Sequence, residues 1–302
     1  MTNPSNSFLS RFWSIGLGLV LLLLLSIGLN SCKKDSTTPP VDDQDAVANV
    51  KLATSATLGS FLTDASGNTL YFFARDVDGT NACTSPACTP QWPVYYEAAI
   101  KVPKALKAED FATKTTADGR SQTTYKGWPL YYFAPPANGV NTREAAGQTG
   151  GNGIGSLWHI INPTYGVVLA SKSVEDKTTH SVSSKTYLAD AQGRTLYFFA
   201  KDNSSPATQP TNCTGGCASI WPALYLSAPP VVPSSLRASD FSSITRDPST
   251  STGPYGSTTT SREQLTYKGH PLYYYAGDNA TRGHVEGHNF NNSGDFWFVA
   301  TP

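Results

Sequence analysis

Cysteine is the residue type whose spacing most directly indicates chemistry in this chain. Four of the five cysteines form two close pairs, Cys83 with Cys88 and Cys213 with Cys217. In an exported protein such pairs favour short-range disulfides, each of which would pin one loop to the fold. A metal site or a redox pair is the alternative, although neither spacing is Cys-x-x-Cys and no histidine lies nearby in the sequence. A Trp-Pro dipeptide follows each pair, so we expect each loop to feed a tryptophan into the core.

Histidines gather at one place, in the segment from His284 to His288. Two histidines four residues apart share one face of a helix and, together with Glu286, would chelate a metal ion. The glycines around them favour a loop instead, so solvated histidines without a cofactor are the other interpretation. His159 and His270 are predicted to pack at the edge of the core.

Three aspartates end aromatic segments of the chain: Asp76, Asp202 and Asp278. Their carboxylates are candidates for catalysis, but we favour the interpretation that each caps the turn after a strand. No nucleophile elbow, phosphate-cradling loop or haem-attachment motif accompanies them. The sequence therefore indicates no particular reaction, and we lean against an enzyme.

The segments that carry these aspartates are dense in aromatic residues. Residues 69–76 (TLYFFARD) return as residues 195–202 (TLYFFAKD), with weaker echoes at 129–134 and 271–278. Aromatic residues at this density favour a strand over a helix. Since both faces of the alternating pattern are largely apolar, each strand is predicted to lie between two layers.

Other landmarks recur around these strands in one order, at offsets from 126 residues (69 to 195) to 142 residues (124 to 266). A period this long indicates tandem domains rather than a solenoid. We predict an all-β protein of two tandem, duplicated antiparallel domains, residues 50–164 and 165–302. Each is expected to contain two aromatic hairpins, a closing strand, a short helical turn and a small disulfide loop.

With these elements in place, the chain resembles the bacterial secreted-repeat lipoproteins that share a Tyr-x-aromatic-x-x-Asp motif. A fourth copy of the motif, at residues 131–136, lacks the aspartate. That family is known chiefly as repeats of unknown function, so the resemblance implies a scaffold and a location but no activity. The motif residues are Tyr71, Phe73, Asp76, Tyr197, Phe199, Asp202, Tyr273, Tyr275 and Asp278.

The N-terminus predicts export and a lipid anchor. Arg11 precedes an apolar run that ends in Leu29-Asn30-Ser31-Cys32, which resembles a lipobox. Residues 1–31 are predicted to be a lipoprotein signal peptide, Cys32 the lipidated residue, and residues 32–49 a polar, disordered tether. A plain secretory peptide is the alternative. The predicted location is the cell envelope, at the outer membrane, with the membrane face left open.

Charge excludes one class of partner and leaves the others open. Lys and Arg number 22 and Asp and Glu number 22, so the chain offers no basic footprint for nucleic acid. Three functions stay open: an anchored, non-enzymatic binding or structural module with an unknown envelope partner; a metal or redox protein that uses His284, Glu286 and His288 or the cysteine pairs; and glycan binding through exposed tyrosine and tryptophan. The repeated tyrosines would line a binding surface if exposed, whereas their repetition favours the core.

Overall fold

The aromatic segments form short strands that pair with the predicted closing strands. Strand β3 (Tyr71–Phe73) pairs antiparallel with β9 (Trp158–Ile160), and β12 (Tyr197–Phe199) pairs in the same way with β17 (Asp295–Val299). This computed structural model describes residues 43–202, 211–246 and 262–302. The predicted signal peptide, Cys32 and the tether up to residue 42 lie outside the described residues.

A hairpin leads into each aromatic strand. Its strands are β1 (Val50–Ser55) and β2 (Gly59–Asp64) in the first repeat, residues 50–164, and β10 (Val167–Glu175) and β11 (Val182–Asp190) in the second repeat, residues 165–302. A turn follows, in which one carboxylate oxygen of Asp64 accepts the backbone N–H groups of Ser66 and Asn68, both at 2.9 Å. Asp190 makes the equivalent pair of bonds in the second repeat. The sequence did not predict the outer strands β1 and β10.

The second predicted hairpin is present in both repeats. In the first repeat its strands are β5 (Ser121–Tyr125) and β6 (Trp128–Pro129), and the turn residues Lys126 and Gly127 have φ of 47° and 79°; β4 (Phe111–Thr115), which was not predicted, pairs with the other edge of β5. Positive φ at both central residues is the geometry that matches the twist of a tight hairpin. The counterparts in the second repeat are β13 (Phe241–Arg246), β14 (Arg262–Tyr267) and β15 (His270–Pro271).

The described residues thus consist mainly of small antiparallel sheets, and the prediction of a duplicated all-β fold is confirmed. The predicted helical turns are η2 and η4, and short helices α2 and α3 occupy the cysteine loops. The remaining elements are α1 (Asp43–Ala46), η1 (Ala74–Asp76), α2 (Cys88–Gln91), η2 (Ala108–Asp110), β7 (Pro136–Ala137), β8 (Val140–Asn141), η3 (Ile154–Ser156), α3 (Gly216–Ile220), η4 (Ala238–Asp240), η5 (Ala276–Asp278) and β16 (Phe290–Asn292).

The last residues of the predicted tether are ordered. Helix α1 comes before β1, and an Asp45 carboxylate oxygen accepts the backbone N–H of Lys104 at 2.9 Å. Asn49 bonds through its side chain to the carbonyl of Ala99 and to the N–H of Lys101, both at 2.7 Å. Residues 43–49 therefore pack on the first repeat.

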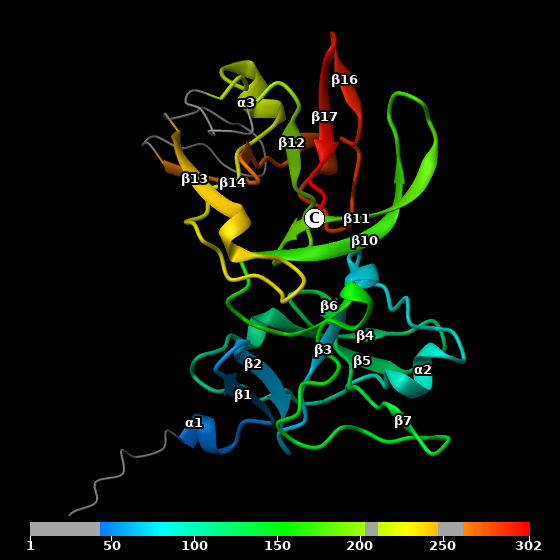
Figure 1. Ribbon diagram of the computed structural model, residues 1–302. Coiled ribbons are helices and arrows are strands. Elements are labelled where there is room, and N and C mark those ends of the chain that lie inside the picture. The colour runs from blue at the N-terminus through cyan, green and yellow to red at the C-terminus, as the bar shows by residue number, and fades with distance from the viewer. Residues whose placement is uncertain (1–42, 203–210, 247–261) are drawn as a thin grey trace, which may run out of the picture. The chain divides into compact units, whose positions relative to one another are not determined.

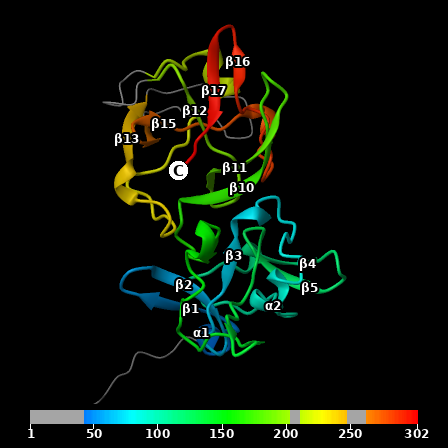
Figure 2. The same cartoon turned by 45° about the vertical axis from the view of Figure 1, so that its right-hand side comes forward.

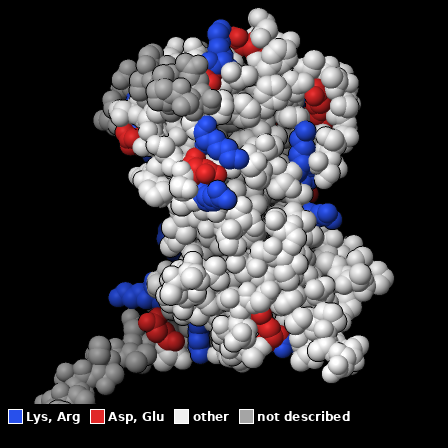
Figure 3. All heavy atoms as spheres, in the orientation of Figure 1, with Lys and Arg blue, Asp and Glu red and all other residues white. Residues whose placement is uncertain are grey.

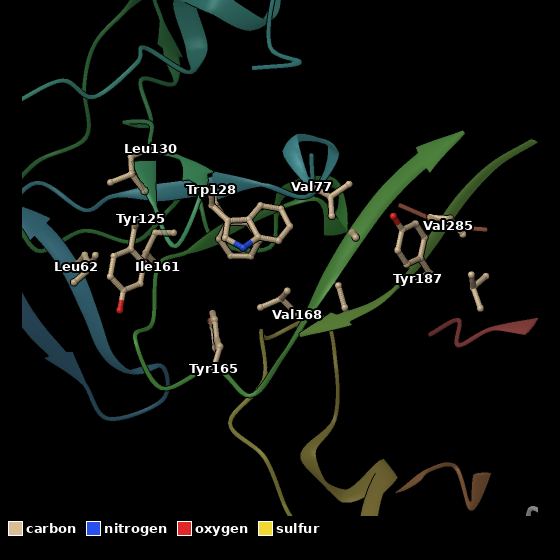
Figure 4. Packing of buried hydrophobic residues seen from close by; sticks show 14 of the residues in the cluster. Leu62, Val77, Tyr125, Trp128, Leu130, Ile161, Tyr165, Val168, Tyr187 and Val285 are labelled. Carbon is tan, nitrogen blue, oxygen red and sulfur yellow. The ribbon is translucent and has the colours of Figure 1, made fainter. Parts of the chain in front are cut away.

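Figures 1 and 2 show the strands of both repeats, and the two repeats share one apolar core (Figure 4). Trp128 of the first repeat faces Tyr165 and Val168 of the second, and its indole N–H donates to the Ala191 carbonyl at 3.0 Å. Arg282 reaches back to donate to the carbonyls of Val77 at 2.7 Å and Lys126 at 3.0 Å. The described residues form one compact unit. The division into separate domains at residues 164 and 165 stays a prediction.

Candidate functional site

Each motif aspartate accepts a hydrogen bond from a motif tyrosine of the other half of its repeat. The Tyr131 hydroxyl donates to Asp76 at 2.5 Å in the first repeat. In the second repeat, the hydroxyls of Tyr273 and Tyr197 donate to Asp202 at 2.6 Å and to Asp278 at 2.7 Å. The two halves of the second repeat therefore exchange tyrosines reciprocally.

The fourth tyrosine finds a carboxylate that the motif does not supply. Residues 131–136 lack the aspartate, and the Tyr71 hydroxyl instead donates to Glu144. Glu144 is a functional residue that the sequence analysis missed. The only signal for it in the sequence was the gap in the fourth motif, which left one tyrosine without a carboxylate.

The second oxygen of each carboxylate holds a loop. Asp76 accepts the backbone N–H of Ala82, Asp202 that of Asn212, and Asp278 that of Glu286, each at 2.8 Å. Glu144 does the same with Gly150 at 2.9 Å. The donors lie six to ten residues away in the chain, so these carboxylates fasten whole loops and not only the turn after the strand.

The backbone brings the paired tyrosines together. Tyr71 and Tyr131 exchange two N–H to carbonyl bonds of 2.9 Å, and Tyr197 and Tyr273 do so at 2.8 and 2.9 Å. All four tyrosines are fully buried, which places them in the core and leaves their rings no face for a glycan.

Burial changes the proton affinity of two of these carboxylates. Asp76 and Asp278 are 0% and 2% exposed, and loss of water around the charge raises the pKa of each to about 7. The hydrogen bonds that these carboxylates accept from the tyrosine hydroxyls and from the backbone N–H groups lower their pKa values. Burial also raises the pKa of the Tyr131 hydroxyl, so that tyrosine stays a hydrogen-bond donor at neutral pH.

A stack of three aromatic rings lies beside each tyrosine pair. In the first repeat, Phe73 stacks on Trp158 with ring centroids 4.0 Å apart, and Trp158 stacks on Trp92 at 3.7 Å. Phe199, Trp297 and Trp221 repeat this arrangement at 4.2 and 3.9 Å. The rings of both stacks are buried; among the described residues, the aromatic side chain with a largely exposed surface is Tyr96. Tyr275 is half-buried and stacks on the outer face of Trp221 at 4.3 Å.

The cysteine pairs form the two predicted disulfides, Cys83–Cys88 and Cys213–Cys217. Trp92 and Trp221 follow directly on the helices in these loops, so the disulfides hold the outer tryptophan of each stack. As disulfides, these cysteines present no thiolate for a metal.

The histidine segment does not assemble a metal site in the described residues, which contain no group of three or more His, Cys, Asp or Glu that could hold an ion. His284 and Glu286 are exposed, and the Glu286 carboxylate pairs with Lys177 at 2.6 Å. His288 is buried and accepts the N–H of Val299 at 3.4 Å. Each of these contacts stabilises a loop, and none points to a bound ion.

The two histidines that were predicted to pack at the edge of the core lie against phenylalanines. His159 is fully buried, with its ring 5.6 Å from that of Phe72, and burial lowers its pKa to about 4. His270 is half-buried, 4.9 Å from the Phe198 ring, and burial lowers its pKa as well. His159 thus lies deeper in the core than predicted.

Charged side chains are few and mixed on the surface. The face seen in Figure 3 shows small scattered groups of both signs, without a large patch of either. Most pairs are exposed, such as Lys107 with Glu109 at 3.8 Å, and exposed pairs contribute little to stability.

Fold and site together define a class of protein: an all-β double repeat in which buried tyrosine–carboxylate pairs and disulfide-held aromatic stacks fasten the loops. A family model described as a secreted repeat of unknown function matches residues 112–139, 178–225 and 257–301. The resemblance inferred from the motif is therefore confirmed, and these three regions are similar to the secreted repeats of that family. No curated protein and no solved structure matches the chain.

The family implies an extracellular or envelope location. Within residues 43–202, 211–246 and 262–302, no helix has the length and apolar character needed to cross a membrane.

Proposed function

We propose that the protein is a lipid-anchored, non-enzymatic module of the bacterial cell envelope that presents a rigid double repeat for binding or structural use. One observation carries the proposal: the residues best suited to chemistry are already engaged in structural bonds. Asp76, Asp202, Asp278 and Glu144 each accept a tyrosine hydroxyl and a backbone N–H. The cysteines form disulfides, and the tryptophans form buried stacks.

The anchor in this proposal is the lipid on Cys32. The lipobox-like ending of the apolar run supports it, as does the family of secreted repeats that the chain matches. A lipoprotein cysteine carries more than one acyl chain, and two or more chains give stable rather than reversible membrane attachment. The outer membrane is the proposed site, with the polar tether joining the lipid to the folded repeats.

Replacement of Cys32 tests the anchor. The full chain and its Cys32→Ser variant would be expressed in a bacterium and separated into membrane and soluble fractions. We expect the wild type in the membrane fraction, with a mass that shows an acylated N-terminal cysteine, and the variant in the soluble fraction. Cys88→Ser is the matched control, because it removes a cysteine without touching the lipobox. Equal membrane retention of wild type and Cys32→Ser would refute the anchor.

The non-enzymatic part has its own test. Purified protein would be incubated with envelope polymers, including peptidoglycan and polysaccharide, and the products followed by mass spectrometry. We expect no turnover. A reproducible reaction that Asp202→Asn abolishes, while circular dichroism shows an unchanged fold, would assign catalysis to a motif carboxylate and overturn the proposal.

A further inference from the structure

The two repeats differ in one buried side chain of the second hairpin. Strand registers pair Phe111 with Tyr125 and Phe241 with Tyr267, so Thr116 and Arg246 occupy equivalent positions. The surroundings agree, because Gln122 and Gln264 are both buried and each donates from its amide to a leucine carbonyl at 2.9 Å.

In the second repeat the guanidinium group of Arg246 fills this place. The side chain is only 6% exposed, and its guanidinium donates to the Gln264 side-chain oxygen at 2.9 Å and to the carbonyl of Cys213. It also lies over the ring of Tyr273, with 5.6 Å between the guanidinium carbon and the ring centroid, a distance at which a cation is attracted to an aromatic face. In the second repeat, a guanidinium group is therefore the chemical group that occupies this position.

In the first repeat Thr116 lines a cavity of about 230 Å³. It is lined by residues that include Asn81, Cys83, Thr116, Asp118 and Arg120. Such a volume corresponds to roughly seven water molecules. Thr116 is far shorter than arginine, and in the first repeat the Gln122 side-chain oxygen accepts the Asn81 amide at 2.8 Å in place of a guanidinium group.

The acceptors for a guanidinium group are present in this cavity. The Cys83 carbonyl corresponds to that of Cys213, and no hydrogen bond within the described residues reaches it. Asn81 also lines the cavity, and its buried side-chain oxygen has no partner among the described residues. At the rim, the Asp118 carboxylate already accepts the Arg120 guanidinium at 2.8 Å and the Thr116 hydroxyl at 2.5 Å, and it is 57% exposed, so it supplies negative charge to an entering cation. A carboxylate has about four acceptor sites, which leaves capacity for a further donor.

We propose that the first repeat binds the guanidinium group of a ligand in this cavity, beside Thr116, the counterpart of Arg246 in the second repeat. The group would donate to the Cys83 carbonyl and to the unpartnered side-chain oxygen of Asn81. Its source is either a small guanidinium compound or an arginine side chain of another protein. This inference rests on the binding role in the proposed function and names the chemical class that is bound.

The test measures binding of agmatine, a small guanidinium compound, to the full chain in detergent by titration calorimetry. For a ligand of this size we expect one site with a Kd of about 1 mM. Putrescine, which carries ammonium groups in place of the guanidinium, should bind at least about tenfold more weakly. An acetylated and amidated Gly-Arg-Gly peptide separates the sources: binding as tight as that of agmatine identifies a protein arginine, and binding of agmatine alone identifies a small molecule.

Two variants give the matched controls. Thr116→Arg supplies the group from the chain itself and should abolish agmatine binding. Arg246→Thr should open a second cavity and raise the stoichiometry from one to two; if this variant does not fold, Thr116→Arg alone decides. The proposal fails if agmatine does not bind, if putrescine binds equally well, or if Thr116→Arg leaves binding unchanged. Because calorimetry does not depend on the lipid on Cys32, such a failure would leave the anchor of the proposed function standing.

Discussion

Replacement of Asp76 by asparagine should flatten the dependence of stability on pH. The Asp76 side chain is fully buried, accepts the Tyr131 hydroxyl at 2.5 Å and the Ala82 N–H at 2.8 Å, and has a pKa raised to about 7. Asparagine has the same shape but no charge. Its oxygen can accept the Ala82 N–H while its amide donates to the oxygen of Tyr131, so both neighbours keep a partner.

The magnitude follows from the two proton affinities. Burial raises the pKa of Asp76 from 3.8 to about 7, so the folded protein binds this proton more tightly than the unfolded chain does. The stabilising contribution is therefore complete below the unfolded pKa and is lost as the pH rises through about 7. Between pH 5 and pH 8 the wild type should lose about 2–3 kcal/mol of unfolding free energy through this one group, a loss that Asp76→Asn does not share.

Urea unfolding at several pH values measures the effect. The quantity of interest is the stability of Asp76→Asn minus that of the wild type, since other titrating groups such as Asp278 and His159 cancel in this difference. Tyr131→Phe is the companion variant. Because the Tyr131 hydroxyl lowers the pKa of Asp76, its loss should move the transition to higher pH, and the double variant should show neither effect.

A difference between wild type and Asp76→Asn that is the same at pH 5 and pH 8 would refute this reasoning. It would mean that Asp76 ionises as it does in water, and hence that the carboxylate is not desolvated. The assignment of the motif aspartates as buried loop fasteners would then be untenable for the first repeat.

Three further predictions concern other buried groups. The His159→Phe variant copies the residue at position 298. Burial lowers the pKa of His159 to about 4, so the wild type loses stability as the pH falls below the unfolded value of 6.5. In urea unfolding, the stability of the variant minus that of the wild type should therefore be about 2 kcal/mol larger at pH 5 than at pH 8, and an equal difference at the two pH values would contradict the prediction. Arg282→Met should cost about 2–4 kcal/mol in the same assay, since it leaves two carbonyls between the repeats without a donor. A loss of stability smaller than that caused by replacing an exposed arginine would count against a core shared by the two repeats. Joint replacement of Cys83 and Cys88 by serine should lower the free energy of unfolding by about 2 kcal/mol, as expected for so short a loop. A reductant should then lower the stability of this variant less than it lowers that of the wild type.

Local pattern predicted the elements well. The aromatic density of residues 69–76 indicated a buried strand, and the spacing of the cysteines indicated disulfides within loops. In each case the controlling interaction joins residues close in the chain. The outer strand β1 was missed because half of such a strand faces solvent, so its alternation is weakly apolar: Lys51 and Ser55 are exposed or half-exposed.

The candidate site was predictable in its members but not in its pairing. The motif named the aspartates and tyrosines, yet nothing local indicates that Tyr131 bonds to Asp76, which lies 55 residues away, or that Glu144 serves Tyr71. Likewise, the sequence placed His284, Glu286 and His288 together, whereas the fold turns the first two outward and buries the third.

The sequence by itself determined the duplication, the strand and turn types and the covalent cross-links, because these depend on residue type and on near neighbours. Only the tertiary structure decided which tyrosine meets which carboxylate, that Trp128 and Arg282 join the repeats into one core, and that a cavity lies beside Thr116, the counterpart of Arg246. The physical reason is that these outcomes arise from close packing between segments far apart in the chain, where the volume and hydrogen-bonding groups of both sides must match.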